Sequence, residues 1–310
     1  MSFEFAVAGA WGDRAPFART IYDPRGLKRA VDSRLEELFP EDSAGATLGA
    51  AMRYAVLAPG KRIRPILTVL ASWELGAPGL RALDAGCALE MVHAASLILD
   101  DLPCMDDSPV RRGAPATHVA FGQDVAVLAA IALLGRAFSA VSSAEGLSSD
   151  QRSRLAAILA HGIGAEGLSG GQLRDLRGFA SAAAMAEVNH EKTGALFVAA
   201  VEMAGVIAEC DEARLSAMRY FATELGQAFQ ILDDLMDGDP VDQGRAEDAG
   251  KLTSLSFLGR DAARRRLNLH LNQARQALPG ESQLAMFMGS IFGEAELREP
   301  AFAGARPGHA

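Results

Sequence analysis

Apolar residues recur at helical spacing along most of the chain, and no stretch alternates at period two as a half-buried strand would. The segment RGLKRAVDSRLEELF, residues 25–39, is the first to show this spacing. Steps that contain proline or glycine interrupt the pattern and end the predicted helices. These helices span residues 25–39, 44–57, 64–76, 79–102, 120–142, 149–167, 184–208, 211–236 and 259–278. The pattern predicts an all-α protein.

The predicted organisation is a single catalytic domain, residues 25–297, between two irregular ends. Residues 1–24 lack periodicity, and residues 298–310 are predicted to be a disordered tail. Ala, Leu, Glu and Arg dominate throughout, and no linker or shift in composition separates two halves. One helical domain is the simpler interpretation of a chain of 310 residues.

Charge and hydropathy exclude several kinds of partner. The net charge of -9 and the pI near 5.2 argue against a nucleic-acid or anionic-membrane surface, so any phosphate site must be local. The longest apolar run, residues 125–134, is too short to span a bilayer, and the N-terminal residues carry too many charges for a signal peptide. The 3 cysteines fit reduced thiols. We expect a cytoplasmic protein without stable membrane insertion.

One internal repeat stands out, because the sequence ILDDL occurs at residues 98–102 and again at residues 231–235. Both copies end an apolar helix, where carboxylates oppose the helix dipole. Asp106 follows the first copy within a loop, and Asp237 lies one turn beyond Asp233 on the same helix face. Mg²⁺ relieves such repulsion, because it binds through one or two carboxylates and takes phosphate oxygens at its other positions. Solvated surface acids are the alternative interpretation, with more weight for a single cluster than for the two together.

Cationic segments accompany the two acidic clusters. GKRIRP places Lys61, Arg62 and Arg64 in a loop that opens a helix, and SPVRRGAPATH places Arg111 and Arg112 after the first cluster. Forked guanidinium groups and helix N-termini both bind phosphate oxygens. The residues together predict a site for diphosphate and magnesium.

In these segments the chain resembles the trans-type isoprenyl diphosphate synthases, most closely the geranylgeranyl diphosphate synthases of bacterial carotenoid pathways. The resemblance covers roughly residues 25–295. Its matching stretches are GKRIRP, EMVHAASLILDDLPCMDD, RRGAPATH, VAVLAAIALLGRAF, GLSGGQLRDL, EKTGALF, LGQAFQILDDLMD and EDAGKLTSLSFLG, in family order. The resemblance implies a single-domain isoprenoid-synthase helical bundle around a central cavity, assembled as a homodimer.

The resemblance also implies roles for individual residues. Metal binding, with three Mg²⁺ ions when substrate is bound, falls to Asp100, Asp101, Asp106, Asp233 and Asp237. The allylic diphosphate is surrounded by Arg111, Lys192, Thr193, Gln230 and Lys251, and the isopentenyl diphosphate is cradled by Lys61, Arg64, His93 and Arg112. Of these, Lys192 and Gln230 join the aspartates as catalytic residues. The implied reaction is head-to-tail condensation of isopentenyl diphosphate with dimethylallyl, geranyl or farnesyl diphosphate.

Two small residues on the helix before Asp100, Ala95 and Ser96, bear on product length. Ala95 lies five residues before Asp100, about 7.5 Å along the helix. A small residue there is expected to leave room past a fifteen-carbon chain, so we expect geranylgeranyl diphosphate as the product. Close helix packing by alanine is the alternative reason for Ala95, and farnesyl diphosphate is the alternative product.

A different class of protein is also compatible with part of the pattern. The pairs Glu90–His93 and Glu187–His190 have the Glu-x-x-His spacing of ferritin-like di-iron bundles, which also need glutamates from two further helices. That assignment leaves the aspartate pairs and the basic loops unexplained. A terpene cyclase needs no second diphosphate cradle, and a catalytically silent partner subunit has no use for two intact acidic clusters. Arg245 departs from the lysine frequent in the family.

Overall fold

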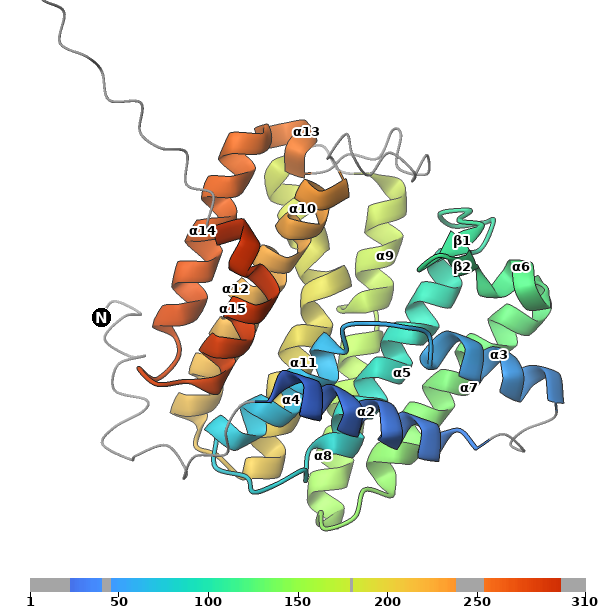
Figure 1. Cartoon of the computed structure of the whole chain (residues 1–310), viewed down its shortest axis with the longest axis horizontal. Helices are drawn as coiled ribbons and strands as arrows, with labels where there is room; N and C mark the ends of the chain where they lie inside the picture. The colour runs from blue at the N-terminus through green and yellow to red at the C-terminus, as the bar shows by residue number, and fades with distance from the viewer. Residues whose placement is uncertain (1–22, 41–45, 179–180, 238–253, 297–310) are drawn as a thin grey trace, which may run out of the picture.

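The computed structural model describes residues 23–40, 46–178, 181–237 and 254–296, which form a bundle of helices (Figure 1). The helices are α2 (Pro24–Leu38), α3 (Ala46–Val56), α4 (Ile63–Glu74), α5 (Leu83–Asp100), α6 (Thr117–Phe121), α7 (Gln123–Ser142), α8 (Ser149–Ile163), α9 (Leu168–Arg177), α10 (Ala182–Asn189), α11 (Ala195–Ala208), α12 (Glu212–Asp237), α13 (Ser254–Leu258), α14 (Arg260–Gln276) and α15 (Gln283–Glu296). A short hairpin pairs β1 (Val110–Arg111) with β2 (Ala114–Pro115). The all-α prediction is confirmed.

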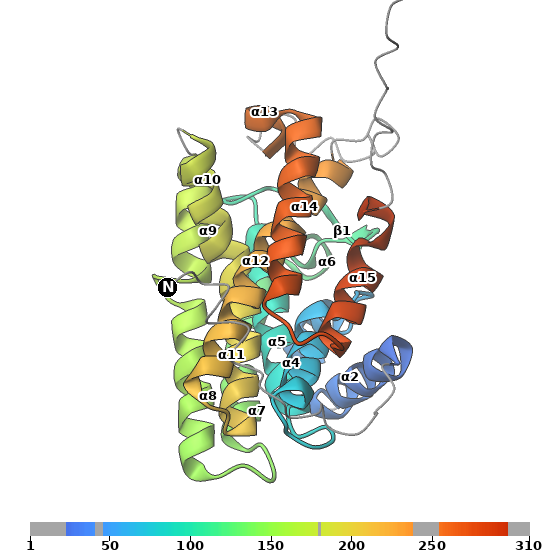
Figure 2. The ribbon, with the colours of Figure 1, turned by 90° about the vertical axis from the view of Figure 1, so that its left-hand side faces the viewer.

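The core lies where α4, α5, α7, α11 and α12 pack together. α5 packs against α4 and α7, and α11 packs against α4, α8 and α12, while α14 covers α12 (Figures 1 and 2). Alanine accounts for most of the buried face of α7, and α4 is buried from Ile63 to Ser72. Small side chains let helix axes approach closely, so the ridges of one helix fit the grooves of the next. The high alanine content is therefore used for tight helix packing.

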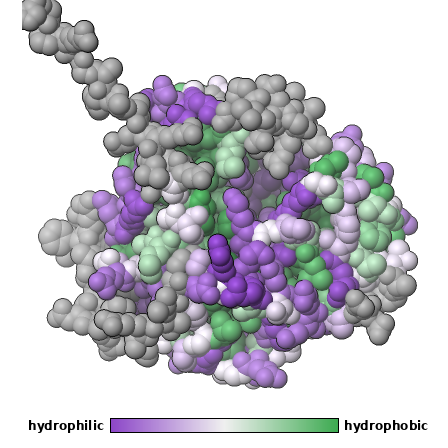
Figure 3. Space-filling view, in the orientation of Figure 1, coloured by the Kyte–Doolittle hydropathy of each residue, from purple (hydrophilic) through white to green (hydrophobic). Residues whose placement is uncertain are grey.

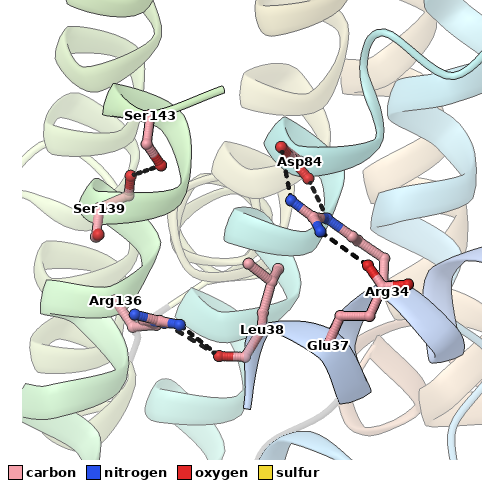
Figure 4. Close-up of polar contacts among 7 residues, drawn as sticks. All are labelled: Arg34, Glu37, Leu38, Asp84, Arg136, Ser139 and Ser143. Carbon is pink, nitrogen blue, oxygen red and sulfur yellow. Dashed lines mark hydrogen bonds and ion pairs between the residues drawn. The ribbon is translucent and has the colours of Figure 1, made fainter. Parts of the chain in front are cut away.

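Polar contacts fasten α2 across the start of α5 and the middle of α7 (Figure 4). The Arg34 guanidinium donates to Asp84 at 2.7 and 3.2 Å and to Glu37 at 2.8 Å. Arg136 on α7 donates to the carbonyl oxygen of Leu38 at 2.6 and 3.2 Å, which satisfies an acceptor at the C-terminus of α2. These contacts hold α2 in place beneath the loop that carries GKRIRP.

Several predicted helices are divided or bounded differently in the structure. Gly122, with φ of 96°, separates α6 from α7, where one helix over residues 120–142 was predicted. α5 begins at Leu83 and not at residue 79, and α9, α15 and the β-hairpin were not predicted. The predicted helix 184–208 contains a π-helical turn, η1 (His190–Gly194), between α10 and α11. Helical spacing alone does not locate such breaks, because the apolar period continues through them.

The ends of the predicted domain are tested only in part. α2 already begins at Pro24, which was assigned to the irregular segment, and the Asp23 carboxylate accepts from the Arg25 amide at 3.1 Å as an N-cap. Residues 1–22 and the predicted tail, 298–310, lie outside the described residues. The domain limits stay predictions.

α7 is unusual in being apolar on both sides. Among the described residues it is the one helix long and apolar enough to cross a bilayer, and 39% of the relevant window is buried inside the protein. This finding rests on length and composition, a test that core helices of globular proteins also pass. The sequence prediction that no apolar run is long enough is thus too strict, because it counted only residues 125–134.

Candidate functional site

In the first acidic cluster, the neighbouring side chains of Asp100 and Asp101 have different partners. At the end of α5, Asp101 is buried and accepts from Nε of Arg111 at 2.9 Å, with a second contact from Nη2. The loop then folds back, since the Asp106 amide donates to the Asp100 carbonyl at 2.9 Å. Asp106 is close enough to raise the pKa of Asp100. Asp100 and Asp106 are therefore brought together, while Asp101 is engaged by Arg111.

The electrostatics of Asp100 suit a ligand of a divalent cation. Burial raises the pKa of Asp100 to about 6, with Asp106 and Asp101 adding to the rise and Lys192 and Arg111 opposing it. A carboxylate that is costly to ionise when alone is a suitable ligand for a hard divalent ion, since the ion supplies the compensating charge. The residues present fit Mg²⁺, which needs only one or two carboxylates beside substrate oxygens.

The second acidic cluster ends α12, and its adjacent aspartates differ in exposure. Asp233 is exposed, whereas Asp234 is buried and accepts from Nε2 of Gln230 at 3.1 Å. The Thr193 hydroxyl donates to Oε1 of the same Gln230 at 3.0 Å. Asp234 and Thr193 together fix the orientation of the Gln230 amide. The side chain of Asp237 lies outside the described residues.

The π-helical turn η1 positions Lys192 between the two clusters. Its Nζ lies 2.6 Å from Oδ2 of Asp175 on α9. α9 approaches so closely that a Cβ at Gly171 would lie 2.3 Å from the backbone nitrogen of Lys192. On the other side, a Cβ at Gly226 of α12 would lie 3.1 Å from Gly194. π-turns often occur at functional sites, and here glycines on two helices allow the turn to be enclosed.

The four residues expected to cradle isopentenyl diphosphate have distinct environments. Lys61 is exposed, whereas Arg64 is buried and its guanidinium carbon lies 5.1 Å from the centroid of the Phe197 ring. Arg112 lies against Gly60, where a Cβ would come within 2.8 Å of its Nη1. Burial, followed by Arg64 and Arg112, lowers the pKa of His93 well below its usual range. His93 is therefore a neutral hydrogen-bonding group here, not a cation.

Arg62 does not share the role that GKRIRP suggested for it. Its backbone is left-handed, with φ of 51°, and its guanidinium turns inward. It donates to Glu90 and Asp32 at 2.8 Å each and to the Ala58 carbonyl at 3.0 Å. Both Arg62 and Glu90 are buried. Arg62 holds the loop that presents Lys61 and Arg64, and it is not itself directed at substrate.

The two clusters and the cradle belong to one region of the molecule. The C-terminal ends of α5 and α12 lie toward the same end of the bundle, near the β1–β2 hairpin (Figures 1 and 2). Lys192 influences the pKa of Asp100, and Asp233 influences that of Arg64, so each acidic cluster faces cations from other elements. The assignment of the two acidic helix ends to one metal and diphosphate site stays a prediction.

Some predicted residues are not tested. Lys251 and Arg245 lie outside the described residues, and no three His, Cys, Asp or Glu side chains in the described part of the chain form a complete metal site on their own. The di-iron alternative is disfavoured, because Glu90 is engaged by Arg62 and Glu187 is exposed. Sequence reasoning missed Asp175 and Glu90 as partners of cations. The GQLRD segment around Asp175 was noted only as a family match.

Comparisons with known proteins show a family match and several similar proteins. Residues 46–294 match the family model described as polyprenyl synthetase. The chain is 45% identical over 262 residues to a geranylgeranyl diphosphate synthase of Pantoea ananas, covering 82% of this chain and 86% of that protein. It is 39% identical over 277 residues to one from Pseudescherichia vulneris, covering 86% and 90%. An FPP/GFPP synthase structure from Zymomonas mobilis matches with a TM-score of 0.77 and 33% identity, covering 86% and 95%.

The raised pKa of Asp100 predicts that Asp100→Asn stabilises the metal-free protein at neutral pH. Folding favours the protonated carboxyl, so its penalty is absent below the unfolded pKa of 3.8, grows as pH rises toward about 6 and is complete above that value. Two pKa units correspond to about 3 kcal/mol. Urea unfolding from pH 4 to 8 with a chelator should show this gain at high pH and none at pH 4. Equal stability of both proteins at pH 8 would contradict the assignment.

Proposed function

Because the chain belongs to the polyprenyl synthetase family, we propose that it is a Mg²⁺-dependent prenyltransferase that condenses isopentenyl diphosphate with allylic diphosphates to give geranylgeranyl diphosphate. The observation that carries the proposal is Asp100, whose pKa is raised to about 6 by partial burial and by the neighbouring Asp106 and Asp101. A metal ion beside such a carboxylate stabilises its ionised form. The relatives from Pantoea and Pseudescherichia, both geranylgeranyl diphosphate synthases, support the substrate class.

Each part of the site has a task in this reaction. Asp100, Asp106, Asp233 and Asp237 would hold three Mg²⁺ ions, which neutralise charge on the departing diphosphate. Asp101 acts through Arg111, because their contact presents the remaining guanidinium donors to the allylic diphosphate. Gln230, held by Thr193 and Asp234, offers a fixed amide beside it. Lys192 exchanges Asp175 for a diphosphate oxygen.

The second substrate binds next to the first. Lys61, Arg64 and Arg112 supply charge for the isopentenyl diphosphate, and neutral His93 supplies a hydrogen bond. The isopentenyl double bond then attacks the allylic carbon as the carbon–oxygen bond to diphosphate breaks. A proton leaves the new chain and passes to the released diphosphate. No protein nucleophile takes part in this sequence, so the protein acts by orientation and by excluding water.

Product length is proposed from the small residues on α5. Ala95 is 1% exposed and Ser96 is 9% exposed, on the helix that ends at Asp100. A growing chain that passes Ala95 meets a methyl group in place of a large side chain. The Zymomonas relative, an FPP/GFPP synthase, keeps farnesyl diphosphate as the alternative product.

We also propose that the protein is a homodimer that pairs through α7. Leu128 is 55% exposed and Ile131 60% exposed, and with Val127 they form one outward apolar stripe. Apolar surface continues onto α6, where Val119 is 53% exposed, and Figure 3 shows apolar surface along this edge of the molecule. A patch of this kind is typical of a protein interface. In such a dimer, a helix of the second protomer covers the exposed apolar side of α7, so no bilayer is required to cover it. Cytoplasmic location and a role in a carotenoid pathway remain predictions from the resemblance.

Incubation with isopentenyl diphosphate and each of the five-, ten- and fifteen-carbon allylic diphosphates tests the function. We expect elongation with Mg²⁺, twenty-carbon product as the end point, and no turnover with EDTA. Asp233→Ala should lower turnover by about two orders of magnitude or more with circular dichroism unchanged, because Asp233 is exposed and not a packing residue. Turnover that survives both EDTA and Asp233→Ala would refute the proposal.

Ala95→Phe is expected to shift the main product from twenty to fifteen carbons, because a ring at this position blocks the path beside α5. Ala94→Phe is the matched control, since Ala94 lies on a different side of the helix and should leave product length unchanged. Chromatography of the dephosphorylated products gives the lengths. Twenty-carbon product from Ala95→Phe at wild-type proportion would show that Ala95 is only a packing residue.

Ile131→Asp is expected to convert the protein from a dimer to a 32.6 kDa monomer, because it places a charge in the middle of the apolar stripe. Leu269→Asp is the matched control, as Leu269 on α14 is 54% exposed and lies on another helix. Light scattering after size exclusion measures both masses. A wild-type protein that runs as a monomer, or an Ile131→Asp protein that stays dimeric, rules out this interface.

A further inference from the structure

Gln172 on α9 has a buried side-chain amide with no hydrogen-bond partner in the described part of the chain. The residue is 8% exposed, and both its Nε2 and its Oε1 are buried. A buried amide without a partner destabilises a fold, because it has given up its hydrogen bonds to water. Such groups are rare in folded proteins, so each one requires a physical reason. The sequence analysis quoted the segment GLSGGQLRDL but assigned no role to Gln172.

A second buried glutamine, Gln151 on α8, shows how a structural amide is satisfied in this protein. Gln151 is 5% exposed. Its Nε2 donates to the Val206 carbonyl at 3.1 Å, and its Oε1 accepts from the Ser148 amide at 2.9 Å. Gln151 therefore joins α8 to α11 and caps the start of α8. Burial alone does not leave a glutamine amide unpaired here, so the reason for Gln172 lies in its own neighbours.

Gln172 lies between the two residues of α9 that meet the π-helical turn η1. On one side is Gly171, where a Cβ would lie 2.3 Å from the backbone nitrogen of Lys192. On the other side, three residues along α9, Oδ2 of Asp175 lies 2.6 Å from the Lys192 Nζ. Residues three apart on a helix are neighbours on its surface, and a glutamine–aspartate pair at this spacing can form a hydrogen bond. In this structure Gln172 does not make that bond.

The burial of the Gln172 amide restricts what its partner can be. A substrate cannot reach either amide atom while both are buried, so the partner is a protein group that changes its contacts. The neighbouring contact that changes in the proposed reaction joins Lys192 to Asp175, because Lys192 exchanges that carboxylate for a diphosphate oxygen. When Nζ leaves, Oδ2 of Asp175 gives up its contact with the ammonium group, and it lies one helical turn from Gln172.

We propose that Gln172 is a positioning residue that replaces Lys192 beside Asp175 when diphosphate binds. Its Nε2 then donates to the Asp175 carboxylate, so the departure of the ammonium group loses less free energy. The bond breaks again when Lys192 returns to Asp175. Gln172 thus acts through Asp175 and Lys192 and does not itself contact the diphosphate. The departure of Lys192 in this scheme rests on the proposed function.

Thermal unfolding without metal or diphosphate tests the unpaired amide. Gln172→Met keeps the length of the side chain and removes the amide, so it should raise the Tm by about 2–4 °C. Gln151→Met is the matched control and should lower the Tm, because it removes two hydrogen bonds. Gln172→Leu repeats the test with a second apolar side chain. A lower Tm for both Gln172 variants would show that the amide is already hydrogen-bonded, and it would overturn the inference.

Calorimetric titration with inorganic diphosphate and Mg²⁺ tests the exchange. Gln172→Met should weaken binding at least about fivefold, because the bond to Asp175 is no longer gained. Gln151→Met should leave the affinity unchanged. In an Asp175→Asn background, Lys192 has no carboxylate to leave, so the effect of Gln172→Met should fall below about twofold. Equal weakening in both backgrounds would show that Gln172 does not act through Asp175, and it would refute the proposal.

Steady-state kinetics separates this role from simple packing. Gln172→Met should raise the KM for farnesyl diphosphate severalfold and leave the KM for isopentenyl diphosphate unchanged, since Lys192 was assigned to the allylic diphosphate alone. An equal rise in both KM values would indicate a general packing defect and contradict the inference. The calorimetric result does not require turnover. A protein that binds diphosphate as expected but transfers no prenyl group therefore refutes the proposed function alone, whereas unchanged diphosphate affinity in Gln172→Met refutes only the role of Gln172.

Discussion

Accumulated negative charge at the ends of α5 and α12 is the constraint on which the rest of this structure depends. The backbone at a helix C-terminus is already partly negative, and both helices add aspartates there. The structure compensates part of this charge internally, through Arg111 on Asp101 and through Lys192 near Asp100. In the proposed function, metal and substrate compensate the remainder. Pairing every carboxylate within the protein would leave no charge for the proposed magnesium ions to compensate.

The sequence predicted that both acidic clusters end helices, but it did not separate the members of each pair. Asp100 and Asp101 are identical in type and adjacent, yet a rotation of about 100° turns them in different directions, and Asp101 accepts from Arg111. Asp233 and Asp234 divide in the same way, as one is exposed and the other holds Gln230. Which member does which depends on the neighbours that tertiary packing supplies. The repeated sequence ILDDL does not show which aspartate of each pair contacts which neighbour.

Residues that act through distant partners were the least predictable. Arg62 looked like another phosphate ligand, because its charge and its place in GKRIRP are the same as those of a true ligand. Its partners, Asp32 and Glu90, come from α2 and α5, and only the folded chain brings them together. The need for glycine at position 171 likewise arises only in the folded chain, because a Cβ there would lie 2.3 Å from the backbone nitrogen of Lys192. The apolar period, in contrast, is a local property, and it predicted most of the helices well.

The contact between Asp175 and Lys192 has a consequence for the catalytic cycle. In the proposed reaction, diphosphate displaces the Asp175 carboxylate before it gains the Lys192 ammonium group, so part of its binding free energy offsets the loss of that ion pair. The same carboxylate is ready to take the ammonium back when the inorganic diphosphate departs. Tight binding of a substrate's diphosphate and rapid release of the inorganic diphosphate product are opposing requirements for such an enzyme. Because Asp175 competes with diphosphate for Lys192, the proposed enzyme binds diphosphate less tightly and releases it faster.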